Sequence, residues 1–161
     1  MRQEISISTF LLLFVVCSLT FKANAQTSNF NVVFYNLLDF PSAAPSNRIS
    51  LLDEVLDNLS PDIFLVCELE NATGAQLILQ EALNNNAAKK FAQAPFIENQ
   101  SSGSDLQQLL FYNTTLFTLE NSAVITTSVR DINHYTLRLN TVDASTNPLL
   151  LEVFVTHFKA S

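Results

Sequence analysis

The sequence is poor in cysteine, glycine and basic residues, and each shortage excludes a class of protein. Of its two cysteines only Cys67 lies beyond the apolar N-terminal segment, so the mature chain cannot form an intrachain disulfide. Two glycines and no internal repeat exclude a fibrous or disordered chain. Eight basic residues against fifteen acidic ones provide no electrostatic footprint for non-specific nucleic-acid binding, although metal ions can supply positive charge locally.

The first 25 residues are typical of a secretory signal peptide. Arg2 precedes an apolar segment from Ile5 to Phe21, and residues 23–25 (Ala-Asn-Ala) supply a cleavage site. A membrane anchor is the alternative, but the uninterrupted apolar run is short for a span of about 20 residues. We expect cleavage after Ala25, export to a periplasmic or extracellular location, and no transmembrane segment in the mature chain. Cleavage removes two basic residues and one acidic residue and leaves 136 residues with a formal net charge of −8, enough for one domain.

The remaining residues predict a mixed α/β fold. Runs of β-branched and aromatic residues predict strands, and apolar residues at helical spacing predict helices. A strand at 30–35, a helix at 46–59 and a strand at 63–67 form a βαβ unit, whose two strands should be parallel. A second helix is predicted at 73–83. The strands that follow should be mainly antiparallel, at 91–96, 107–112, 116–120, 123–127, 134–140 and 149–155.

Three predicted strands end at a polar residue: the first at Asn36, the second at Glu68 and the last at His157. In open α/β sheets ligands bind beyond the carboxyl ends of the strands, and parallel pairing places Asn36 and Glu68 on strands about 5 Å apart. An acid and an amide there can hold or orient a hard cation such as Mg²⁺. The pattern does not show that His157 reaches the same edge. Each residue alone also fits an ordinary surface, turn or packing role, so spacing by itself names no chemistry.

Three stretches, in order, resemble the endonuclease/exonuclease/phosphatase superfamily of DNase I-like proteins. Residues 32–40 (VVFYNLLDF) resemble the family's first strand with its Asn, and residues 61–71 (PDIFLVCELEN) resemble the motif whose Glu is a metal ligand. Residues 156–161 (THFKAS) resemble its His motif. The resemblance implies that residues 26–161 form a truncated domain. Its fold class would be α/β, half of a four-layer α/β/β/α sandwich, with one mixed β-sheet and helices on one face.

The resemblance also implies a Mg²⁺- or Mn²⁺-dependent hydrolase of the phosphodiesterase, phosphatase or nuclease type. Glu68 would bind the metal, Asn36 beside it would orient phosphate or nucleophile, and His157 would contact the scissile phosphate. Arg130 lies where relatives often have an arginine and is a candidate phosphate contact, with a surface charge as the alternative. Glu70 and His134 are interpreted as solvated surface residues. The substrate could be nucleic acid, phospholipid or sugar phosphate.

The family's second half normally contributes a Gly-Asp-x-Asn motif and a Ser-Asp-His motif, and neither occurs in this sequence. These motifs would supply the pair that activates water, so we expect this chain alone to be inactive, with the missing C-terminal half as a candidate partner. A single sheet covered on one face would expose its other apolar face. We therefore also expect poor solubility unless something covers that face. A non-catalytic secreted binding module on the same scaffold is the alternative function.

Overall fold

The computed structural model describes residues 29–102 and 105–158, so the predicted signal peptide lies outside the described residues. Within the described part of the chain no helix is long and apolar enough to cross a membrane. The elements follow one another as β1 (Val32–Phe40), α2 (Arg48–Leu59), β2 (Ile63–Leu69), α3 (Ala72–Leu77), a π-helical continuation η1 (Ile78–Leu83), β3 (Phe91–Gln93), β4 (Gln107–Asn113), β5 (Phe117–Ile125), β6 (Ile132–Leu139) and β7 (Leu150–Val155).

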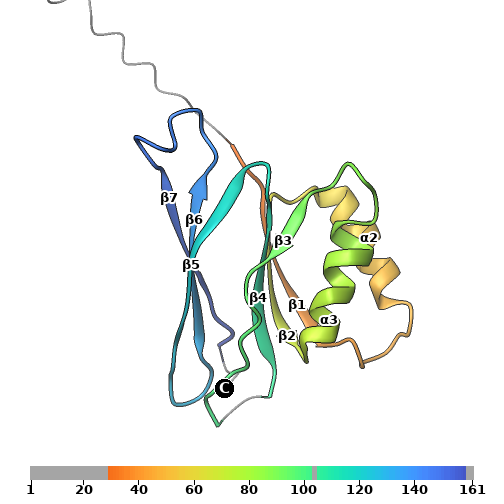
Figure 1. The fold of residues 1–161 in the computed structure, drawn as a ribbon. Helices are drawn as coiled ribbons and strands as arrows, with labels where there is room; N and C mark the ends of the chain where they lie inside the picture. Colours follow the sequence, from red (N-terminus) through yellow and green to blue (C-terminus); the bar gives the residue numbers. More distant parts are fainter. Residues whose placement is uncertain (1–28, 103–104, 159–161) are drawn as a thin grey trace, which may run out of the picture.

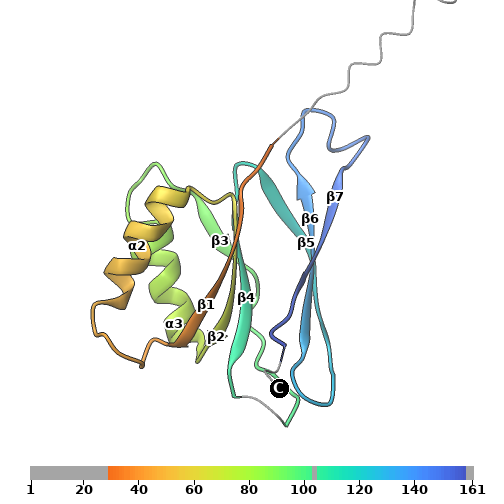
Figure 2. The same ribbon diagram turned by 180° about the vertical axis from the view of Figure 1, so that it is seen from behind.

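The fold has three layers (Figure 1). Sheet A has the strand order β1-β2-β4-β3, in which β1 and β2 are parallel and the other pairs are antiparallel. Helices α2 and α3 cover one face of sheet A, and sheet B, the antiparallel set β5-β6-β7, lies along the other face. The view from behind shows that the edge strands β1 and β7 lie on the same side of the molecule (Figure 2). The predicted mixed α/β class, with helices on one face of a mixed sheet, is confirmed.

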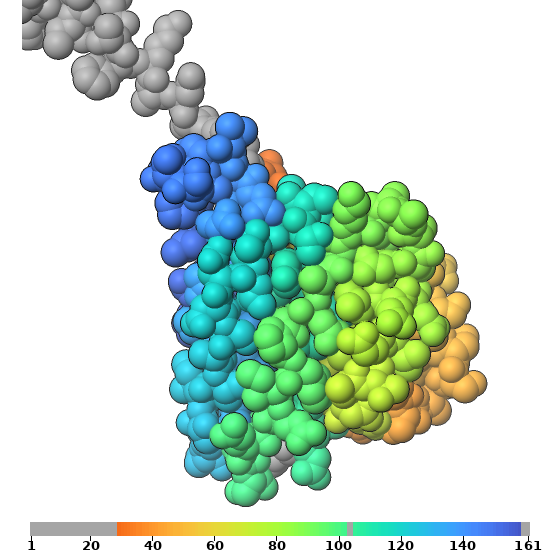
Figure 3. Space-filling model, in the orientation of Figure 1, coloured from red at the N-terminus to blue at the C-terminus, as the bar shows by residue number. Residues whose placement is uncertain are grey.

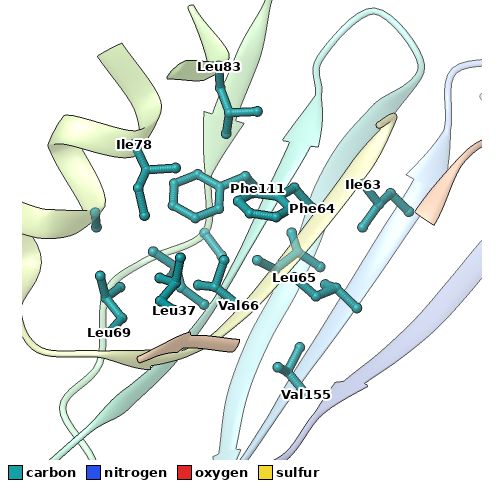
Figure 4. Packing of buried hydrophobic residues seen from close by; sticks show 14 of the residues in the cluster. Leu37, Ile63, Phe64, Leu65, Val66, Leu69, Ile78, Leu83, Phe111 and Val155 are labelled. Atoms are coloured by element: carbon teal, nitrogen blue, oxygen red, sulfur yellow. The ribbon is translucent and has the colours of Figure 1, made fainter. Parts of the chain in front are cut away.

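The apolar core lies on both faces of sheet A. On the helical side, Phe64 and Phe111 stack with ring centroids 5.9 Å apart, and Ile78 lies beside them (Figure 4). On the other side, Leu65 of β2 and Val155 of β7 belong to the same buried cluster. In the space-filling view the atoms of sheet B meet those of the β3–β4 region without a gap on this face (Figure 3). One continuous apolar core therefore holds all three layers.

Sheet B covers the second face of the central sheet, so the expectation that this face is open to water is wrong. The alternating residues Tyr135 and Leu137 of β6 are fully buried and belong to the cluster that contains the core of sheet A. Alternation in a strand shows that one face is apolar, but it does not show which surface that face covers. The strands after β4 do not continue the single sheet that the sequence predicts but form a second sheet that covers the first. The premise for poor solubility is therefore wrong.

The segment predicted as two strands, 116–120 and 123–127, is one strand, β5. Its pairing with β6 continues from Phe117 to Ile125, with a shift in register between Leu119 and Asn121. A bulge of this kind inserts an extra residue without ending the ladder. The polar run at residues 120–122 resembles a turn in the sequence, and the bulge accommodates it within the strand.

The contact between the two sheets can be tested with a pair of leucine variants. Leu137→Ala should lower the free energy of unfolding by about 2–5 kcal/mol, because it removes a fully buried side chain from the core between the sheets. Leu150→Ala, in the next strand of the same sheet, removes a side chain that is 55% exposed and should change it by about 0.5 kcal/mol or less. Urea unfolding followed by circular dichroism measures both. Equal losses would contradict the packing of sheet B on sheet A.

Candidate functional site

Glu68 follows the buried run of β2 and adopts a left-handed backbone conformation, with φ 58°. Strict alternation from Phe64 and Val66 would place Glu68 on the helical face. The positive φ and a register shift between Val66 and Leu69 turn it away, and Leu69 is buried instead. This conformation costs a residue other than glycine about 1–3 kcal/mol, so the surrounding packing must hold it. The result is a carboxylate at the end of β2, with a side chain that is 16% exposed.

The three polar residues at the strand ends meet at one carboxylate oxygen. Asn36 Nδ2 donates to Glu68 Oε1 at 2.9 Å, and His157 Nε2 lies 3.2 Å from the same oxygen. Asn36 and Glu68 come from sheet A, and His157 follows β7 of sheet B. In Figure 1 β1, β2 and β7 all run to the same end of the sandwich. The structure thus brings together all three residues that the sequence singled out.

Arg130, the fourth candidate, lies beside His157 and holds the chain that carries it. Its Nη1 donates to the backbone oxygens of His157 and Phe158, at 3.3 and 3.2 Å. Its Nε is buried and has no hydrogen-bond partner within the described part of the chain. The structure therefore shows a role in placing His157, and the predicted contact of Arg130 with phosphate stays a prediction.

The protonation of His157 follows from its surroundings. Burial lowers the pKa of its imidazole, the nearby Arg130 guanidinium lowers it further, and the Glu68 carboxylate opposes both effects. His157 is therefore mainly neutral at pH 7, because even its ordinary pKa lies below that pH. A neutral imidazole can donate one hydrogen bond and accept another at the site.

A polar link between the sheets, which the sequence analysis missed, lies close to this end of the sandwich. Gln108 of β4 is buried, and its Nε2 donates to the backbone oxygen of Asp131 at 2.8 Å. In return, Asn133 Nδ2 of β6 donates to the backbone oxygen of Gln108 at 3.1 Å. These bonds fix the position of sheet B against sheet A near Arg130. No local pattern marks Gln108 or Asn133, because their partners lie more than twenty residues away.

The side chains at this site could hold a divalent metal through one carboxylate, that of Glu68. Mg²⁺ is commonly held by one or two carboxylates together with waters and substrate phosphates. Glu68 can supply such a carboxylate, whereas Asn36 Oδ1 already accepts from Leu38 N at 2.8 Å. Glu70 is turned elsewhere, and its carboxylate accepts from Ser42 Oγ. Over residues 29–102 and 105–158, no three Asp, Glu, His or Cys side chains converge as a metal site.

Cys67 precedes Glu68 and is buried, as is typical of a free cysteine that packs as a small hydrophobic residue. Burial raises the pKa of its thiol to about 11, the Glu68 carboxylate raises it as well, and Arg130 opposes them. A thiol with this pKa is about one part in a thousand thiolate at pH 8, and the thiolate is the nucleophile.

Cys67 should therefore react with Ellman's reagent only after the chain unfolds. The measurement uses the chain without residues 1–25, in which Cys67 is the only thiol. At pH 8 we expect no fast release of thionitrobenzoate from the folded protein, and one equivalent after addition of guanidinium chloride. Fast stoichiometric labelling of the folded protein would contradict the burial of this residue.

Among the solved structures similar to this chain are the Nocturnin catalytic domain and TDP2. No protein-family model and no curated protein matches the sequence. The human Nocturnin catalytic domain, solved with bound sulfate, is 17% identical with a TM-score of 0.49, over 76% of this chain and 48% of that one. TDP2 from C. elegans is 13% identical with a TM-score of 0.42, over 78% of this chain and 33% of that one. This chain thus spans less than half the length of either neighbour. Both belong to the superfamily that the motifs resemble, but with TM-scores below 0.5 they do not decide the roles of individual residues here.

Proposed function

We propose that this chain carries the metal-binding part of a phosphoester hydrolase site of the endonuclease/exonuclease/phosphatase type. The observation that carries the proposal is the convergence of Asn36 Nδ2 and His157 Nε2 on Glu68 Oε1, at 2.9 and 3.2 Å. The two sheets bring these groups together from positions 36, 68 and 157, which are the positions of the three motif matches. Export across the membrane, inferred from residues 1–25, is part of the proposal.

Each residue has a chemical task in this proposal. Glu68 holds Mg²⁺ or Mn²⁺, which supplies positive charge for the phosphoryl oxygens. Asn36 keeps the Glu68 carboxylate in place through its Nδ2. His157, as a neutral imidazole with a single N–H, would direct that N–H to a phosphate oxygen in place of Glu68 Oε1 when substrate binds. Arg130 holds the main chain of His157 and adds positive charge nearby. With a formal net charge of −7 for the full chain, this local positive charge is what would draw a phosphoester to the site.

The proposal includes a partner that supplies the groups for activating water. The chain has two histidines, and His134 lies away from the site, with Nε2 2.6 Å from Glu152 Oε2 on the outer face of sheet B. A second half of the domain is the candidate partner. Exposed apolar side chains on the edge strand β1, such as Phe34, offer it a surface.

A non-catalytic binding module is the second candidate function. The observations that favour it are the single carboxylate of the site and the exposed apolar residues along the edge strand β1, among them Val32 and Leu38. An edge strand with exposed backbone and apolar side chains is a template for pairing with another chain. Absence of metal binding at Glu68 would favour this function over the first.

Metal binding can be located with Mn²⁺, which broadens the NMR signals of nearby nuclei. In the full chain we expect Mn²⁺ to broaden the signals of Asn36, Glu68 and His157 before those of other residues. Glu68→Gln should abolish this selective broadening, because it removes the one charged ligand. Glu70→Gln is the matched control and should leave it unchanged, since that carboxylate bonds to Ser42. Broadening centred elsewhere, or retained in Glu68→Gln, would contradict the metal site.

A second test measures whether the chain alone catalyses phosphoester hydrolysis. We expect no hydrolysis of bis(p-nitrophenyl) phosphate with Mg²⁺, because among the described residues His157 is the one histidine at the site and no second acid–base group lies beside it. Release of p-nitrophenolate is followed by absorbance. Turnover that disappears in Glu68→Gln would show that the chain needs no partner for activity.

A further inference from the structure

Residues 37–43, which comprise the irregular last residues of β1 and the turn after it, determine how the side-chain amide of Asn36 lies. Leu38 and Asp39 both have left-handed backbone conformations, with φ 48° and 51°, and neither is a glycine. Asn36 Oδ1 accepts from Leu38 N at 2.8 Å, while its Nδ2 donates to Glu68 Oε1 at 2.9 Å. One end of the amide is thus bonded to the turn and the other to the carboxylate. A change in the turn must reorient the amide or break one of these two bonds.

Arg48, the first residue of α2, holds this turn together. Its guanidinium donates to the backbone oxygens of Leu37, Asp39 and Ala43, the last two at 3.3 Å. It also lies 5.4 Å from the centre of the Phe40 ring, a distance at which a cation is attracted to the ring face. The five donors of an arginine form a planar fork that one lysine ammonium cannot reproduce. Arg48 thus bridges three carbonyl groups of a turn whose backbone is otherwise unfavourable.

We propose that Arg48 is a positioning residue for the site: by holding turn 37–43 it fixes the amide of Asn36, and through that amide the carboxylate of Glu68. Three hydrogen bonds form the path, from Arg48 to the turn, from the turn to Asn36 Oδ1, and from Asn36 Nδ2 to Glu68. The proposal deepens the proposed function, on which it rests, because it concerns the same site. A purely structural arginine would stabilise the fold without any effect on the Asn36 amide.

The side-chain NH₂ signal of Asn36 distinguishes the two roles in the metal-free full chain. Its assignment comes from its loss in Asn36→Asp, and its position without the carboxylate acceptor comes from Glu68→Ala. In Arg48→Met we expect the signal to move most of the way to its Glu68→Ala position, while the backbone signals of β4 and β6 stay in place. Arg48→Lys should shift it part of the way, because a single ammonium group replaces the fork.

Arg138→Gln is the matched control. It also removes an arginine that makes a side-chain hydrogen bond, from Nε to Glu120 Oε1 at 2.5 Å, but on the outer face of sheet B. We expect it to leave the Asn36 signal unmoved. An unchanged Asn36 signal in folded Arg48→Met would overturn the proposal, and if that variant does not fold, an unchanged signal in Arg48→Lys would do so. These spectra are recorded without metal. A failure of Mn²⁺ to bind would therefore contradict the proposed function, while the effect of Arg48 on the Asn36 amide could still be measured.

Discussion

The apolar contact between the two sheets is the interaction on which the site depends. Glu68 belongs to sheet A and His157 follows sheet B, so their 3.2 Å contact exists only while the sheets pack together. The packing rests on buried residues such as Leu65, Tyr135 and Val155, and on the bonds of Gln108 across the sheets. Burial of apolar area has no direction of its own. The polar bonds near the site therefore determine where one sheet sits on the other.

Positive charge near the site is used to hold backbone rather than to neutralise Glu68. Arg130 bonds to the carbonyls that follow β7, and Arg48 bonds to carbonyls at the end of β1 and in the turn after it. Hydrogen bonds from a charged donor are stronger than neutral ones, so each arginine can hold a loop that regular secondary structure does not. The Glu68 carboxylate is left with the amide of Asn36 and the neutral imidazole of His157 as its contacts.

Unfavourable backbone conformations gather at the same place. Among the described residues other than glycine, four have positive φ, and Leu38, Asp39 and Glu68 lie at the ends of β1 and β2, beside the site. Such conformations persist only where the surroundings hold them, and they are frequent at functional sites. Here the buried neighbours Leu37, Phe40 and Leu69 anchor the chain on either side of them. At Glu68 the strain is therefore offset by packing on the helical face and serves to turn its side chain toward His157 of sheet B.

The sequence by itself determined the local elements and the residues worth examining. The apolar runs before Asn36 and Glu68 predict two parallel strands, and the structure pairs them from Val32–Ile63 to Asn36–Cys67, because that signal is local. Only the tertiary structure decided that the strands after β4 form a second sheet, that His157 reaches Glu68, and that Arg48 serves the site. An alternating pattern shows that one face of a strand is apolar, but it does not show which surface covers that face. Hydrogen bonds such as those of Arg48 and Gln108 join chain segments that meet only in the folded state.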